Sequence, residues 1–238
     1  MLFVNAFAPR ALLASLALVL TACGGASSDE PKNNNATDAA ENKTENATGA
    51  FAEMSVGSDD AKVTVIEYAS TTCPHCADFH NRVYSQIKKD YVDTGKVKFI
   101  FREFPTPPAN LAAATFMLAR CAADQKGSEG YFLVLDTLFK TQGVQKERSG
   151  WLFSEDTRAD LLRIANQVNL NEADFDTCIN RPDLLEHINN TVEHARNKYE
   201  IQSTPTFVIN GNVRNPRHTV EAFSEILDEA LEKAETAQ

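Results

Sequence analysis

The sequence has little positive charge, few cysteines and no apolar run long enough to cross a membrane. Its 238 residues include 23 Lys and Arg against 33 Asp and Glu, a formal net charge of −10. Nucleic-acid binding depends on neutralising phosphates with basic side chains, so this balance argues against a nucleic-acid partner. Five cysteines is an odd number, so at least one should have a separate role. The length suits one domain plus tails.

The N-terminal residues show the pattern of an export signal. Arg10 precedes an apolar run, Ala11 to Leu20, which is half the roughly 20 residues that a membrane-spanning helix needs. The run ends in Leu20-Thr21-Ala22-Cys23, which resembles the lipobox of bacterial lipoproteins. That resemblance implies removal of residues 1–22 and a lipid anchor on Cys23. The alternative is an ordinary signal peptide with an incidental cysteine, and the single Arg, with no Lys, departs from the usual pattern.

Residues 23–50 are rich in Asn, Thr, Ala and Glu and contain almost nothing to bury. Such a composition predicts a disordered tether between the lipidated Cys23 and a folded body at 51–238. Gly24 and Gly25 are not the Asp that, in some bacteria, retains lipoproteins at the inner membrane. We therefore expect a lipid-anchored protein of the bacterial cell envelope, on the periplasmic side of the inner or outer membrane.

A strand–helix–strand unit opens the folded body. The β-branched run Val63 to Tyr68 predicts a buried strand and leads into Cys73-Pro74-His75-Cys76. Pro74 is well placed in a first helical turn. Apolar residues then recur at helical spacing: Phe79, Val83, Tyr84 and Ile87. A second strand is predicted at Val97 to Phe104, so the cysteine pair has the βαβ context typical of a redox motif.

The remaining chain is predicted to be mostly helical and to end on a small antiparallel element. Apolar positions at helical spacing indicate several helices between about residues 106 and 200. A strand follows at Thr206 to Ile209, and Asn210-Gly211 is a strong signal for a two-residue hairpin turn. The last helix carries one apolar stripe: Val220, Phe223, Ile226, Leu227, Ala230 and Leu231.

Two cysteines separated by two residues at a helix start are suited to dithiol chemistry. The spacing lets one turn close a disulfide, and the amides and dipole of the helix N-terminus lower the pKa of the first thiol. Cys73 is therefore predicted to be the exposed, attacking sulfur and Cys76 the resolving one, with His75 able to donate a hydrogen bond or carry charge beside Cys73. Half of a zinc site is an alternative, but such a site needs four ligands and the other cysteines are isolated. A purely structural disulfide is disfavoured by the βαβ context.

Two motifs together resemble those of DsbA-type thiol oxidases in the thioredoxin superfamily. Cys73-Pro74-His75-Cys76 matches their active-site tetrapeptide, and Ser203-Thr204-Pro205-Thr206-Phe207 matches the cis-proline loop. Pro205 lies 129 positions beyond Cys76, whereas plain thioredoxins have a short gap. The resemblance covers about residues 51–236. It implies an α/β thioredoxin fold with a large inserted all-helical subdomain at about 106–200.

The resemblance also assigns roles to single residues. Pro205 corresponds to the cis-proline that faces the redox pair, and Thr204 to the position that tunes substrate release and potential. Glu67 resembles the buried acid that relays protons for Cys76; the alternative is a paired strand carboxylate. The implied cofactor is the Cys73–Cys76 disulfide itself, with no metal. The implied partners are unfolded secreted or envelope proteins with reduced cysteines, and a DsbB-like quinone-linked membrane oxidase.

Cys121 and Cys178 both lie on apolar helical faces of the insertion. In an oxidising compartment, two cysteines left over from a motif more often pair than stay free, so a structural Cys121–Cys178 disulfide is predicted. The alternative is a pair of buried free thiols. The five cysteines are then assigned as one lipidated, two catalytic and two structural residues.

A dithiol oxidase is the leading functional hypothesis. A reductase or isomerase would use the same chemistry, but nothing in the sequence indicates a dimerisation module and the Pro74-His75 dipeptide favours oxidation. A surface lipoprotein whose main role is binding is an alternative of another class. A copper-handling thioredoxin relative is a third, although its extra His ligand and wider cysteine spacing are not evident.

Overall fold

The computed structural model describes residues 47–143 and 150–236. The predicted signal peptide at 1–22, the lipidation site Cys23 and all but the last residues of the predicted tether lie outside this part of the chain. Within the described residues, no helix is both long and apolar enough to span a membrane.

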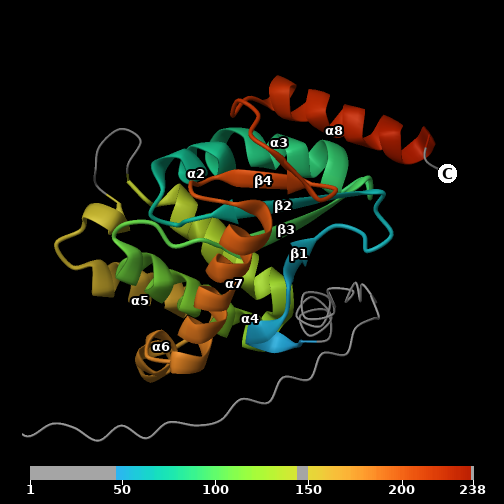
Figure 1. The fold of residues 1–238 in the computed structure, drawn as a ribbon. Coiled ribbons are helices and arrows are strands. Elements are labelled where there is room, and N and C mark those ends of the chain that lie inside the picture. The colour runs from blue at the N-terminus through green and yellow to red at the C-terminus, as the bar shows by residue number, and fades with distance from the viewer. Residues whose placement is uncertain (1–46, 144–149, 237–238) are drawn as a thin grey trace, which may run out of the picture.

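A five-stranded mixed sheet forms the centre of the fold (Figure 1). Its strand order is β1-β3-β2-β4-β5; β2 and β3 run parallel and the other pairs are antiparallel. The strands are β1 (Met54–Val56), β2 (Val63–Ala69), β3 (Val97–Glu103), β4 (Thr206–Ile209) and β5 (Asn212–Arg214). The central strand β2 is rich in β-branched and aromatic residues and largely buried, as a strand covered on both faces should be.

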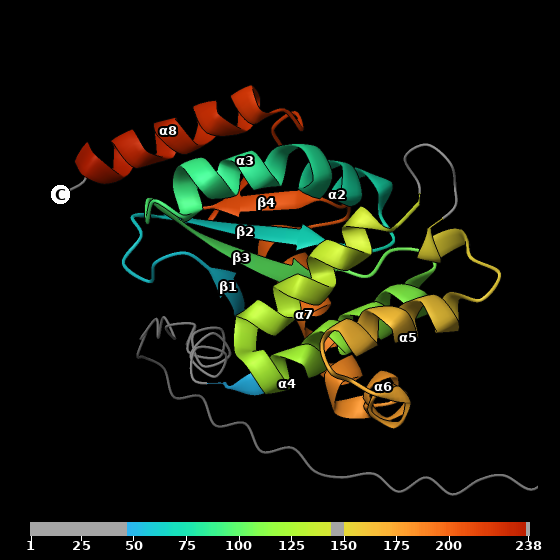
Figure 2. The same cartoon turned by 180° about the vertical axis from the view of Figure 1, so that it is seen from behind.

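Helices cover both faces of this sheet. One face is covered by the continuous helical segment that follows the redox motif and by the last helix: α2 (Pro74–Phe79), π-helical η2 (His80–Tyr84), α3 (Ser85–Ile87), π-helical η3 (Lys88–Val92) and α8 (Val220–Thr236). The other face carries the helices of the insertion: α4 (Ala109–Lys140), α5 (Thr157–Gln167), α6 (Glu172–Ile179) and α7 (Pro182–Tyr199). Two single 3₁₀ turns, η1 (Gly49–Phe51) and η4 (Trp151–Phe153), complete the elements. Figures 1 and 2 show these two layers from opposite sides.

Each layer has its own apolar core. Phe79 and Phe207 pack with Phe223 between the sheet and α8, with ring centroids 4.8 to 5.1 Å apart. On the opposite face, Phe101 of β3 packs against Phe116 and Tyr131 of α4. The predicted α/β class, a thioredoxin fold with an inserted helical subdomain, is confirmed by this arrangement.

Three local features refine the prediction. Asn210 and Gly211 have φ values of 45° and 79°, the left-handed conformations that a tight hairpin turn requires. Strand β1 was not predicted, because three residues are too few to show an alternating pattern. Helix α4 bends at Lys126 and Gly127, where Gly127 has a φ of 58°, so this long helix consists of two segments.

Candidate active site

The redox pair lies where β2 gives way to α2. Cys73 is the residue that caps the helix, Pro74 occupies its first turn, and Cys76 lies one turn further along. The side chain of Cys76 is completely buried and Cys73 is 7% exposed. Cys73 is therefore more exposed than Cys76, as predicted, but its side chain is nearly buried rather than open to solvent. The loop before β4 covers it, because the Cys73 Sγ lies 3.4 Å from the carbonyl oxygen of Thr204.

The two thiols are pushed toward opposite charge states. A hydrogen bond from the Cys76 thiol, supported by the Thr204 side chain and the backbone amides of His75 and Cys76, lowers the pKa of Cys73 to about 6, although burial opposes this shift. Burial raises the pKa of Cys76 well above its ordinary value, and the charges of Cys73 and Glu67 raise it further. At neutral pH Cys73 is then a thiolate and Cys76 a thiol, a division of roles that suits an attacking and a resolving sulfur.

The loop predicted to face the redox pair does so. The Thr204–Pro205 peptide bond is cis, and β4 begins at Thr206, paired antiparallel with Tyr68 of β2. This register carries the loop to the carboxyl end of β2, from which the redox motif departs. Cys73, Cys76, Thr204 and Pro205 are thus brought together from two segments far apart in the sequence.

Glu67 lies in the middle of β2 with no exposed surface. Its Oε2 is 2.8 Å from Nε2 of His80, itself buried, so Glu67 is the paired strand carboxylate that the alternative interpretation expected. Its charge also contributes to the raised pKa of Cys76, so Glu67 interacts with both His80 and the resolving thiol. His80 was not singled out from the sequence. Its position four residues after Cys76 on a helix places both on one face, which was the available signal.

Gln142, also missed by sequence reasoning, holds the loop that carries Cys73. Its buried amide Nε2 donates to the carbonyl oxygens of Thr71, at 2.6 Å, and of Cys73, at 3.1 Å. The contact spans about 70 positions of sequence and follows the end of α4. No local sequence motif predicts a hydrogen bond between residues so far apart in the chain, so nothing in the sequence indicates the role of Gln142.

His75 is exposed and points its ring toward a second histidine. The centroids of His75 and His218 lie 6.5 Å apart in an edge-to-face arrangement, and burial lowers the pKa of His218. Within residues 47–143 and 150–236, no group of three or more His, Cys, Asp or Glu side chains is arranged to hold a metal ion.

The predicted structural disulfide is present. Cys121 of α4 and Cys178 of α6 are joined with their Cα atoms 6.2 Å apart, within the range that disulfides require. Both cysteines are buried in the core of the insertion. The bond therefore links helices of the inserted subdomain and takes no part in the redox pair.

Comparison with known proteins agrees with this geometry. A family model described as thioredoxin matches residues 50–229. The crystal structure of alpha-DsbA1 from Wolbachia pipientis is 31% identical in sequence, with a TM-score of 0.66, and the match covers 78% of this chain and 94% of that one. The crystal structure of oxidised BdbD from Bacillus subtilis has a TM-score of 0.64 at 20% identity. The match covers 76% of this chain and 93% of BdbD, and it shows a likeness of fold alone.

A curated relative from Rickettsia felis, provisionally named a protein-disulfide oxidoreductase, is 29% identical over 181 residues. The match covers 76% of this chain but 61% of the relative. The chain thus spans less than two thirds of the length of that protein.

Proposed function

The chain is a DsbA-like member of the thioredoxin family, and from this premise we propose that it is a thiol–disulfide oxidoreductase that donates the Cys73–Cys76 disulfide to other proteins. The observation that carries the proposal is the lowered pKa of Cys73, about 6. A stabilised thiolate favours the reduced form of the pair, which makes the disulfide form a stronger oxidant.

The transfer proceeds in two exchanges. A client thiolate attacks Sγ of Cys73, the Cys73–Cys76 bond breaks, and Cys76 leaves with the electron pair and takes up a proton. A second client thiolate then attacks the client sulfur of the mixed disulfide, and Cys73 leaves as a thiolate. The client loses two electrons and the Cys73–Cys76 pair gains them. A DsbB-like quinone-linked membrane partner would accept these electrons and restore the disulfide.

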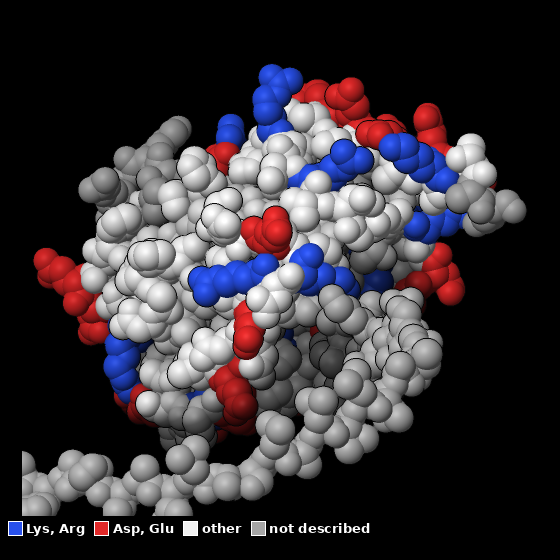
Figure 3. Space-filling model, viewed as in Figure 1, with Lys and Arg blue, Asp and Glu red and all other residues white. Residues whose placement is uncertain are grey.

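The surface around the pair suits an unfolded polypeptide as client. Two described loops lie beside the redox motif. In the loop after β3, the carbonyl oxygen of Thr106 accepts a hydrogen bond from the hydroxyl of Thr72. The other loop precedes β4 and contains Thr204. The exposed or partly exposed residues of these loops and of the first turn of α2 carry no formal charge, with His75 counted as neutral: Pro74, His75, Thr106, Pro107, Pro108, Gln202, Ser203 and Thr204. The part of the face in Figure 3 that lies over the start of α2 shows few charged side chains. Recognition there would rest on backbone and apolar contacts, which tolerate many sequences.

We place this chemistry in the bacterial cell envelope, with Cys23 lipidated and the segment between Cys23 and η1 as a tether to the membrane. The predicted tether boundary at residue 50 is too late, because Gly49–Phe51 form η1 and Ala50 is buried in the folded body. The basis is the lipobox resemblance of Leu20 to Cys23. Mass spectrometry of the N-terminal peptide should show acyl chains on Cys23; a processed chain without them would remove the anchor.

The direct test is oxidation of a reduced, unfolded ribonuclease by the oxidised chain. We expect stoichiometric loss of ribonuclease thiols and recovery of its activity, none of it with Cys73→Ser, and accumulation of a mixed disulfide with Cys76→Ser. A chain that instead reduces or reshuffles disulfides without oxidising free thiols would favour the reductase or isomerase alternative and contradict the proposal.

A further inference from the structure

A buried acid–base pair lies behind the redox cysteines. Glu67 Oε2 and His80 Nε2 are 2.8 Å apart, and neither side chain is more than marginally exposed. The charge of Glu67 reaches the Cys76 thiol, whose pKa it helps to raise. Cys76 and His80 also share one face of the helix that runs from α2 into η2. The three groups therefore form a row of titratable side chains that starts at the resolving sulfur.

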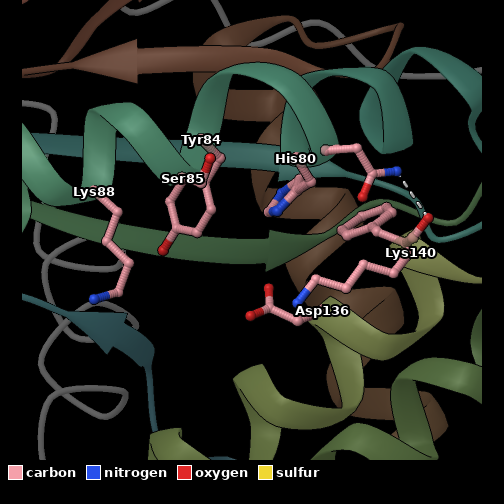
Figure 4. A pocket seen from close by; sticks show the side chains of 8 residues that line it. His80, Tyr84, Ser85, Lys88, Asp136 and Lys140 are labelled. Carbon is pink, nitrogen blue, oxygen red and sulfur yellow. Dashed lines mark hydrogen bonds between the residues drawn. The ribbon is translucent and has the colours of Figure 1, made fainter.

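This row ends at a small pocket on the molecular surface. His80 lines a pocket of about 110 Å³ between the α2–η3 helical segment and the end of α4. Figure 4 shows its lining, with His80 and Tyr84 on one side and Asp136 and Lys140 of α4 on the other. The rim residues Ser85 and Lys140 are exposed, so the pocket communicates with solvent. The pocket therefore offers His80 a path to bulk water.

The hydrogen bonding of the pair is incomplete. Oε1 of Glu67 and Nδ1 of His80 are both buried and have no hydrogen-bond partner among the described residues. A buried polar group without a partner lowers the stability of the folded state, because it gives up its hydrogen bonds to water and gains none. Half-satisfied buried pairs are therefore poor stabilising devices. The pair is better explained by a role that needs groups able to gain and lose protons.

Packing alone does not account for a histidine at this position. The His80 ring stacks on Phe139, with centroids 4.2 Å apart and planes at 21°, and lies near Tyr84. A phenylalanine would fill such an aromatic site without a buried unpaired nitrogen. His80 also begins η2, a π-helical segment, and such segments occur frequently at functional sites.

We propose that His80 is a positioning residue that exchanges protons between Glu67 and the solvent of the pocket during thiol–disulfide exchange at Cys76. When the Cys73–Cys76 bond breaks, the Cys76 sulfur leaves as a thiolate. The Glu67 carboxylate accepts a proton from His80 in its imidazolium form and passes it to this thiolate, directly or through one water molecule. The neutral ring of His80 then regains a proton from the pocket. Every proton moves in the opposite direction when the disulfide re-forms.

The charges that face His80 come from each element packed around it. Glu67 of β2 and Asp136 of α4 are acidic, and Lys88 of η3 and Lys140 of α4 are basic. Tyr84 stays neutral because burial raises its pKa, and Phe101 of β3 and Phe139 bring no charge. The inference rests on the proposed thiol–disulfide chemistry but not on its direction.

The test measures reduction of the Cys73–Cys76 disulfide by dithiothreitol from about pH 5 to about pH 9, the range in which imidazole titrates, with rates corrected for dithiothreitol thiolate. His80→Gln keeps an amide that can bond Glu67 but cannot carry a proton. We expect it to react about tenfold more slowly at acidic pH, with the difference disappearing at alkaline pH, where an imidazole has no acidic proton to give. Ser85→Ala, on the rim of the same pocket, should follow the native profile. A His80→Gln rate lowered by one constant factor at every pH would indicate a structural role and overturn the proposal.

The variant Glu67→Gln shows whether His80 acts through Glu67. If it does, adding His80→Gln to Glu67→Gln should change the corrected rate no further. Independent, multiplying effects would contradict the proposed order of groups.

A measurement on the native protein covers the case in which His80→Gln fails to fold. The ring ¹⁵N resonances of His80 should titrate at different pH in the oxidised and reduced forms, because reduction changes the protons and charges that Glu67 and Cys76 hold. Identical titrations in the two forms would overturn the proposal. A native disulfide that dithiothreitol does not reduce would show instead that the thiol–disulfide chemistry itself is wrong, and the proposal would fall with it.

Discussion

At the scale of single residues, Cys73 and Cys76 differ because their surroundings differ. Cys73 receives hydrogen bonds at the start of a helix, and Cys76 is enclosed in the core beside Glu67. The reactive thiolate of Cys73 and the protonated, resolving thiol of Cys76 therefore lie one helical turn apart. Their difference in charge state, rather than the presence of two cysteines, is what directs an incoming sulfur to Cys73.

Thiolate absorbance of the reduced protein checks this difference. We expect a transition with a midpoint at about pH 6, the pKa of Cys73, that is absent in Cys73→Ser. Cys76→Ala should move the midpoint upward, because the Cys76 thiol is the largest source of the lowered pKa. A native midpoint near the ordinary thiol value of 9.0 would contradict the assignment.

The same shift has a consequence for stability. The pKa of Cys73 is lower in the folded than in the unfolded chain, so its contribution is fully present above pH 9 and is lost as the pH falls toward 6. The Cys76 pKa is raised, so its opposing effect begins only above its ordinary value. Denaturant unfolding of the reduced protein should therefore show stability relative to the oxidised form rising from about pH 6 to about pH 8. A flat or falling difference would argue against a stabilised thiolate.

The site residues that could be predicted from the sequence are those that belong to a local motif. Cys73 and Cys76 stand in one tetrapeptide, and Thr204 and Pro205 in one loop motif. His80 and Gln142 were missed because their roles depend on contacts between segments: His80 meets a carboxylate on another element, and Gln142 meets a loop some 70 positions earlier. Such pairings are made by the tertiary fold and leave no periodic trace in the sequence.

At the scale of elements, a buried ion pair joins the sheet to the inserted helices. Arg120 of α4 donates to both carboxylate oxygens of Glu103 at the end of β3, at 2.6 and 2.9 Å. Burial works against ionisation of Glu103, but the charge of Arg120 outweighs it and lowers the pKa of Glu103. Arg120 also donates to the carbonyl oxygens of Ala50 and Ala52, so one side chain ties three segments together.

Arg120→Met should therefore destabilise the fold by about 3 kcal/mol, because it leaves the Glu103 carboxylate buried without its partner. Urea unfolding of the oxidised protein measures the loss. Arg163→Ala, which removes an exposed partner of Asp160, provides the matched control and should leave the midpoint unchanged. Equal midpoints for the native protein and Arg120→Met would show that the pair carries no net stability.

The order of elements could be predicted because β2, β3 and the helices have clear apolar periods. Strand β1 could not be predicted, because its three residues are too few to show a pattern and only their pairing with β3 defines them as a strand. The bend of α4 was also missed. It depends on the left-handed conformation of Gly127, whereas glycine alone also occurs in straight helices.

At the scale of the whole molecule, the sheet, the insertion and the two long-range loops converge on one redox pair. The insertion supplies Gln142, just after α4, and the pocket wall on α4, and the segment before β4 supplies the cis-proline loop. The sequence-level expectation of a large helical insertion was confirmed, but its contribution to the active site became visible only in the fold. The central proposal is that electrons flow from client thiols to the Cys73–Cys76 pair, and it rests on the lowered pKa of Cys73.

The reduction potential of the Cys73–Cys76 pair tests that claim most directly, by equilibration with glutathione redox buffers and thiol trapping. A potential well above that of thioredoxin, about −270 mV, and toward the value of about −120 mV known for DsbA, is the result we predict. A potential at or below that of thioredoxin would contradict the assignment as a dithiol oxidase.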